Sequence, residues 1–146
     1  MLPDNQNMEM NVEKQHRTLL ILWVAFLMSI VMYLFIAVVL PRPEEPVVRP
    51  LAMALSFASA FLTVVSFGVK KKFVSNAISQ QNPQLVTKGF ILAAAMCEAA
   101  ALLGLLDLFI ARDRNYWTLI AIALLGMLVN FPRRSHLVSA NFKPGM

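Results

Sequence analysis

The chain has 146 residues, of which 58% are hydrophobic and only 14% are charged. A soluble domain carries about 25% charged residues, so this composition is typical of a membrane protein and argues against a soluble catalytic domain. The net charge of +5 would suit nucleic acid, but the basic residues lie at the ends of apolar runs, where membrane topology explains them. We therefore expect one integral membrane domain over residues 1–146, with the lipid bilayer and not nucleic acid as its partner.

A polar N-terminal segment leads into the first long apolar run, at about residues 18–40. A secretory signal has an apolar core of only about 7–15 residues, so this longer run predicts a membrane anchor that is retained. The next stretch, residues 41–50, holds four prolines, which predict a stiff extended turn. Pro50 suits the first turn of the following helix, where a missing N–H costs nothing.

The second span covers about residues 51–69, and its helix can continue to Ile78. Hydroxyl residues recur along one face of this helix: Ser56, Ser59, Thr63 and Ser66. Small residues also stand at every fourth position: Ala52, Ser56 and Ala60. Small and hydroxyl residues mark the face on which another membrane helix packs, although hydroxyl groups can instead bond to carbonyls of their own helix.

The third span, at about residues 89–111, follows a polar loop at 70–88, in which an Asn-Pro pair predicts the start of the helix. One carboxylate, Glu98, lies near the middle of this span. An ionisable group at the bilayer centre costs at least about 2.5–3.5 kcal/mol, so it requires a partner, a proton or a function. Asp107 is expected near the far end, close to Arg112 or Arg114. Small residues around Glu98 are expected to allow close helix packing: Ala94, Ala101 and Gly104.

The fourth span, at about residues 117–131, is short and is followed by a polar tail. The N-terminal segment, the 70–88 loop and the C-terminal tail hold nine Lys and Arg residues, whereas the turns at 41–50 and 112–115 hold four. The positive-inside rule therefore predicts that both termini and the 70–88 loop are cytoplasmic. The predicted fold is all-α: a four-transmembrane-helix bundle with short loops, expected in a bacterial inner membrane.

Motifs of enzymes and metal sites are absent from the sequence. There is no nucleophile elbow, phosphate-binding glycine loop or HExxH, and His, Cys and carboxylate residues do not have metal-ligand spacing. Both histidines lie outside the apolar runs, so we expect no metal, no other cofactor and no enzyme activity. Cys97 is interpreted as a small apolar packing residue.

Two functions fit a glutamate in the third span. In the first, Glu98 binds a proton reversibly, because low dielectric favours the neutral form of a carboxyl group, and the chain takes part in proton translocation, alone or within a larger complex. Ser56, Ser59 or Thr63 would then be its hydrogen-bond partners. In the second, the chain is a non-catalytic structural or accessory subunit, in which a hydrogen bond of Glu98, worth about 0.6–2 kcal/mol, fixes helix contacts.

The hairpin of the second and third spans resembles the proteolipid, or c, subunits of rotary ATPases. The similar segment is A-I-S-Q-Q-N-P-Q-L-V-T-K-G-F-I-L-A-A-A-M-C-E-A-A-A-L-L-G-L-L. The resemblance implies that Pro83 is the loop proline of that family, Glu98 its proton-binding carboxylate, Ala99 the small residue after it, and Gly104-Leu105 the later Gly-Leu pair. It also implies proton transport and a homo-oligomer or other membrane subunits as partners. Elsewhere the chain is similar to small four-helix bacterial membrane proteins that carry such a hairpin.

Small multidrug transporters also have four helices and one membrane glutamate. In that family the glutamate lies in the first helix, and the first span of this chain has no glutamate. We therefore do not expect drug transport.

Overall fold

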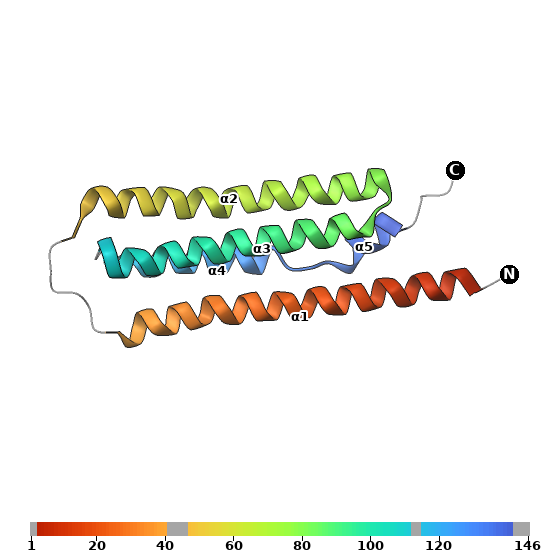
Figure 1. Ribbon diagram of the computed structural model, residues 1–146, viewed down its shortest axis with the longest axis horizontal. Coiled ribbons are helices and arrows are strands. Elements are labelled where there is room, and N and C mark those ends of the chain that lie inside the picture. Colours follow the sequence, from red (N-terminus) through yellow and green to blue (C-terminus); the bar gives the residue numbers. More distant parts are fainter. Residues whose placement is uncertain (1–2, 41–46, 112–114, 142–146) are drawn as a thin grey trace.

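The computed structural model describes residues 3–40, 47–111 and 115–141, and all regular structure in these residues is helical. The helices in chain order are α1 (Pro3–Val39), α2 (Arg49–Gln80), α3 (Pro83–Leu106), the π-helical turn η1 (Asp107–Ala111), α4 (Tyr116–Val129) and α5 (Arg134–Asn141). The long helices run side by side, and α3 contacts α1, α2, α4 and α5 (Figure 1). The fold is therefore an all-α bundle with α3 at its centre.

Three segments are long and apolar enough to cross a membrane: Asn11–Val39, Arg49–Gln80 and Pro83–Ala111. The pair α4 and α5 meets the same criteria together, with a bend of 49° between the two helices. By length and composition the described residues thus contain three candidate spans, or four if the bent pair is one span. All four predicted spans lie on these helices, which is compatible with an integral membrane protein.

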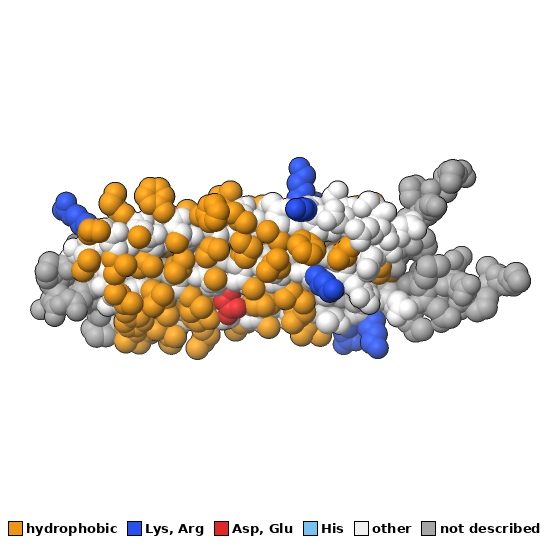
Figure 2. All heavy atoms as spheres, turned by 45° about the horizontal axis from the view of Figure 1, so that its top comes forward, with side chains coloured by type: hydrophobic (Ala, Val, Ile, Leu, Met, Phe, Trp, Pro, Cys, Tyr) orange, Lys and Arg blue, Asp and Glu red, His pale blue; other side chains and the backbone are white. Residues whose placement is uncertain are grey.

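The distribution of hydrophobic side chains fits helices surrounded by lipid. In α3, 44% of the most apolar stretch is buried, compared with 22% in α2 and 11% in α1. Many large hydrophobic side chains instead point outward, and on the face shown in Figure 2 they cover most of the left two-thirds of the molecule. Acidic side chains interrupt that hydrophobic surface at one place only (Figure 2). Burial therefore also identifies α3 as the central helix.

The hairpin between α2 and α3 is shorter than predicted. Asn82 caps α3 as the Asn-Pro pair predicted, because its Oδ1 accepts a hydrogen bond from the Gln84 N–H at 3.1 Å. The expected continuation of the second helix to Ile78 is confirmed, since α2 extends to Gln80. The polar loop predicted at 70–88 is therefore reduced to the two residues that connect α2 and α3. Lysine is a good helix former, and no Gly or Pro interrupts residues 70–80, so the charged stretch extends the helix instead of ending it.

Close contacts in the bundle depend on residues without a Cβ. A Cβ at Gly89 would overlap the Cβ of Phe73 on α2, and one at Gly104 would lie 2.8 Å from the Ile120 Cγ1 on α4. Gly68, in contrast, has no neighbouring atom within 4 Å of the corresponding position. Two of these glycines therefore set how closely α3 approaches its neighbours.

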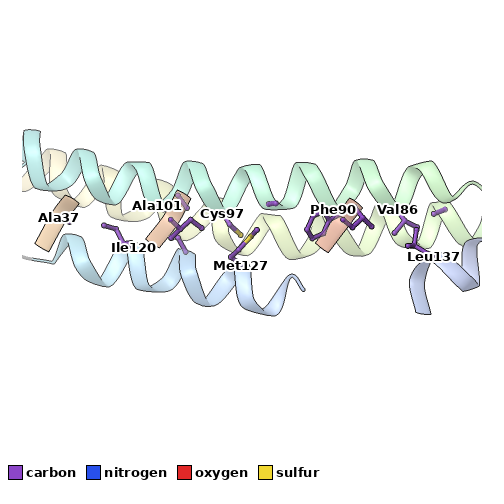
Figure 3. Packing of buried hydrophobic residues seen from close by; sticks show 14 of the residues in the cluster. Ala37, Val86, Phe90, Cys97, Ala101, Ile120, Met127 and Leu137 are labelled. Atoms are coloured by element: carbon purple, nitrogen blue, oxygen red, sulfur yellow. The ribbon is translucent and has the colours of Figure 1, made fainter. Parts of the chain in front are cut away.

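Small side chains fill the core between α3 and α4. Cys97 and Ala101 of α3 lie on the side that faces Met127 and Ile120 of α4, and all four are fully buried (Figure 3). Towards the other end of α3, the same cluster continues to α5, where Leu137 is also fully buried. The core is thus one continuous cluster along α3.

The last part of the chain differs from the predicted polar tail. After α4 ends at Val129, the chain forms the short helix α5, and Arg134 at its start lies 3.9 Å from the Glu13 carboxylate of α1. The N-terminal half of α1 and the start of α5 are therefore at the same end of the bundle (Figure 1). This ion pair is exposed and contributes little stability.

The predicted environment of Asp107 is described only in part. Asp107 begins η1 and is fully buried. Its expected neighbours Arg112 and Arg114 lie outside the described residues, as do residues 41–46 of the proline-containing turn.

Candidate functional site

The carboxyl group of Glu98 lies between α3 and α1, where two hydroxyl groups of α1 donate to one of its oxygens. The Ser29 hydroxyl donates to Glu98 Oε1 at 2.5 Å, and the Tyr33 hydroxyl donates to the same oxygen at 3.0 Å. Ser29 and Tyr33 are one helical turn apart, with 2.9 Å between their side-chain oxygens. We call these three side chains, Ser29, Tyr33 and Glu98, the hydroxyl–carboxyl cluster.

The hydroxyl–carboxyl cluster can form hydrogen bonds with Glu98 in either its charged or its neutral form. Each hydroxyl carries one hydrogen, so both hydroxyls donate to a carboxylate, and the short bond from Ser29 is typical of a charge-assisted hydrogen bond. If Oε1 instead carries a proton, that proton can be donated to Ser29 Oγ, and the Ser29 hydrogen can turn to the Tyr33 oxygen. Because only hydroxyl hydrogens rotate, a proton can be exchanged without movement of the heavy atoms.

The surroundings of the cluster are apolar. Glu98 is half-buried, and Leu102, one turn further along the same face of α3, is 40% exposed. Met32 of α1, next to Tyr33, is 52% exposed. Among the residues that the structure describes, Glu98 forms no ion pair and belongs to no group of side chains that could hold a metal ion. The carboxyl group therefore has neutral hydroxyl partners at an outward-facing, hydrophobic edge of the bundle.

The predicted partners of Glu98 on α2 do not reach it. Ser59 donates to the Ala100 carbonyl oxygen at 3.0 Å, and Thr63 donates to the Ser59 carbonyl oxygen at 3.0 Å. Ser56 lines a groove between α2 and α4. The prediction that these hydroxyls bind the carboxyl group is therefore corrected. The reason is rotational: residues such as Cys97 face α2 and α4, whereas Glu98, about 100° further round the helix, faces α1.

The small residues predicted to pack between helices fall into two groups. Most are buried: Ala52, Ala94, Ala101 and Gly104. Ala60 is exposed instead, because it lines the same groove as Ser56, which no helix among the described residues fills. The small residues of α2 therefore do not form the one continuous packing face that their spacing predicts.

A second polar cluster lies in the core, separate from Glu98. Asn130, just after α4, donates from Nδ2 to Ser66 Oγ of α2 at 3.1 Å and to Cys97 Sγ of α3 at 3.5 Å. Ser66 Oγ and Cys97 Sγ are 3.4 Å apart. Cys97 is fully buried, as expected of a packing residue, but its sulfur also contacts hydrogen-bonding groups of Ser66 on α2 and of Asn130 after α4.

Comparisons with known proteins leave the family of this chain open. No protein-family model, curated protein or solved structure matches it. The resemblance of the α2–α3 hairpin to proteolipid subunits of rotary ATPases therefore stays a prediction based on the residues around Glu98.

Sequence reasoning identified Glu98 but missed its partners. The signal was present, because Ser29 and Tyr33 are hydroxyl residues spaced four apart in the middle of the first apolar run. That spacing places both on one face of α1. What the sequence did not indicate is that this face of α1 meets the Glu98 face of α3.

Proposed function

We propose that Glu98 binds and releases a proton within the membrane and that this exchange is the function of the chain, in proton translocation alone or as part of a larger membrane complex. The observation that carries the proposal is the pair of hydroxyl donors, Ser29 and Tyr33, on a carboxyl group surrounded by apolar side chains. A site that exchanges protons must hold both protonation states, and this cluster does so by rotating hydroxyl hydrogens. Neutral partners also leave the charge of the site free to change, whereas a basic partner would hold the carboxylate ionised.

The outward position of Glu98 supports the same proposal. A carboxyl group at the edge of the bundle can meet a second subunit or a proton path that lies outside this chain. The resemblance to proteolipid subunits points the same way, since it implies a homo-oligomer or assembly with other membrane subunits. In the proposed topology both termini and the turn between α2 and α3 face the cytoplasm of a bacterial inner membrane, which follows the distribution of Lys and Arg.

A structural role for Glu98 is the second candidate function. The hydroxyl–carboxyl cluster joins α1 to α3, and hydrogen bonds between membrane helices contribute about 0.6–1.7 kcal/mol. The chain would then be a non-catalytic accessory subunit of a membrane complex. The two candidates differ in one property, which is whether the carboxyl group changes its protonation in the assembled membrane.

Carbodiimide labelling of Glu98 in native membranes tests the proposal. Carbodiimides are apolar and modify carboxyl groups that are protonated and reachable from lipid. We expect labelling of the full chain to fall as the pH rises through a midpoint, and we expect none of this labelling in Glu98→Gln, which keeps the shape of the side chain but cannot react. Mass spectrometry of the intact chain measures the modified fraction.

Absence of labelling at Glu98 would contradict the proposal. If correctly folded chain is not modified at Glu98 at any pH, the carboxyl group does not exchange protons with its surroundings, and the accessory role is the better description. Labelling that does not change with pH would also contradict reversible proton binding.

A further inference from the structure

A pocket of about 230 Å³ lies at the end of the bundle where α2, the end of α4 and α5 meet. Its polar lining consists of Lys70, Lys71, Asn130 and His136. Its remaining walls are hydrophobic, with Phe67 on one side. No acidic residue is among the described residues that line it. The volume is several times the share of about 30 Å³ that one water molecule occupies in the liquid, so the pocket can hold a small polar group.

Lys70 is fixed at this pocket by the end of α4. Its Nζ donates to the carbonyl oxygen of Phe131 at 3.1 Å, which satisfies a backbone acceptor beyond the last helical turn. An ammonium group has three donors, so two remain for a ligand. Lys70 is half-buried, and in the described part of the chain it forms no ion pair. Burial, and next the positive charge of Arg133, lower the pKa of Lys70 to about 8, so Lys70 is mostly protonated at neutral pH and has a second cationic group near it. A partly buried cation among other basic groups favours an anion as ligand.

Asn130 belongs to the buried inner wall of the pocket. The residue is only 1% exposed, and its Nδ2 is used by Ser66 and Cys97. Its Oδ1 is buried and has no partner among the described residues. Because solvent does not reach this oxygen, the donors available to a ligand in the pocket come from the lysines.

We propose that this pocket binds a phosphate group. Lys70 and Lys71 bind the phosphate oxygens. Two sources have this chemistry: the headgroup of phosphatidylglycerol in the adjacent leaflet, and inorganic hydrogen phosphate. The hydrophobic wall at Phe67 suits the glycerolipid source, since a chain next to the headgroup would lie against it. The proposal is independent of Glu98, which lies between α3 and α1.

The first experiment compares two neighbouring lysines. Lys71 lines the pocket and Lys72 does not, both are exposed, and their replacement changes the net charge equally. Native mass spectrometry of the full chain measures binding of phosphatidylglycerol and, as the reference lipid, phosphatidylcholine. We expect Lys71→Gln to weaken phosphatidylglycerol binding about fivefold, the effect of losing one cationic contact to an anionic headgroup, while Lys72→Gln binds as the unaltered chain does. Binding of phosphatidylcholine should be equal in the unaltered chain and in the two variants.

A competition with inorganic phosphate distinguishes the sources. If millimolar phosphate displaces phosphatidylglycerol from the unaltered chain, the pocket accepts the free ion. If it does not, while Lys71→Gln still weakens lipid binding, the ligand is the lipid headgroup. Equal losses in Lys71→Gln and Lys72→Gln would overturn the proposal, because binding would then follow the net charge of this end of the bundle. Binding unaffected by either substitution would overturn it as well.

Discussion

Replacing Gly89 by alanine is expected to lower the free energy of unfolding of the bundle by about 1–3 kcal/mol, the usual cost of overpacking a core. The added Cβ would overlap the Cβ of Phe73, which is attached directly to the backbone of α2 and cannot rotate away. The backbones of α2 and α3 must therefore separate. Because α3 is the central helix, this separation also disturbs its contacts with α1 and α4. Unfolding of the full chain in mixed micelles with increasing dodecyl sulfate, followed by tryptophan fluorescence, measures the change.

Gly68 provides the matched control for this prediction. It is also a helical glycine, but a Cβ there meets no atom within 4 Å. Gly68→Ala should leave stability unchanged or raise it by up to about 1 kcal/mol, since alanine loses less backbone entropy in a helix. Equal effects of the two substitutions would mean that helix propensity and not the contact between α2 and α3 determines the result.

Removing both hydroxyl groups around Glu98 is expected to increase carbodiimide labelling several-fold at a given pH. Ser29→Ala with Tyr33→Phe deletes the two donors that stabilise the charged form of the carboxyl group, so a larger fraction of Glu98 should be neutral and reactive. The same double variant should lose about 0.6–1.7 kcal/mol of stability per hydrogen bond between α1 and α3. Labelling and unfolding are measured on the same preparations.

Tyr116→Phe is the control for loss of a tyrosine hydroxyl. Tyr116 is buried and donates to the Ala37 carbonyl oxygen at 3.3 Å, so its replacement also removes a hydrogen bond to α1 but leaves the hydroxyl–carboxyl cluster intact. It should lower stability without changing the labelling of Glu98. Unchanged labelling in the variant that lacks Ser29 and Tyr33 hydroxyls would mean that these groups do not control the proton on Glu98.

The sequence alone was sufficient for features that depend on neighbouring residues. The apolar runs predicted the long helices, because a membrane-spanning helix satisfies all its backbone groups within one segment. The Asn-Pro pair predicted where α3 begins, since Asn82 and the following proline cap a helix through local contacts. No Gly or Pro interrupts the chain up to residue 80, which fits the expected continuation of the second helix to Ile78 and the observed end of α2 at Gln80.

The pairing of helix faces was decided only by the tertiary structure. The sequence singled out Glu98 and a face of hydroxyl residues on α2, and it predicted that the two meet. In the structure, Ser59 and Thr63 bond to backbone carbonyls, and Glu98 meets Ser29 and Tyr33 of α1. The rotation of α3 about its axis is fixed by contacts far apart in the chain, such as Gly104 against Ile120 of α4. Lipid is as apolar as the helix faces, so hydropathy does not indicate which faces pair; close packing of small residues does.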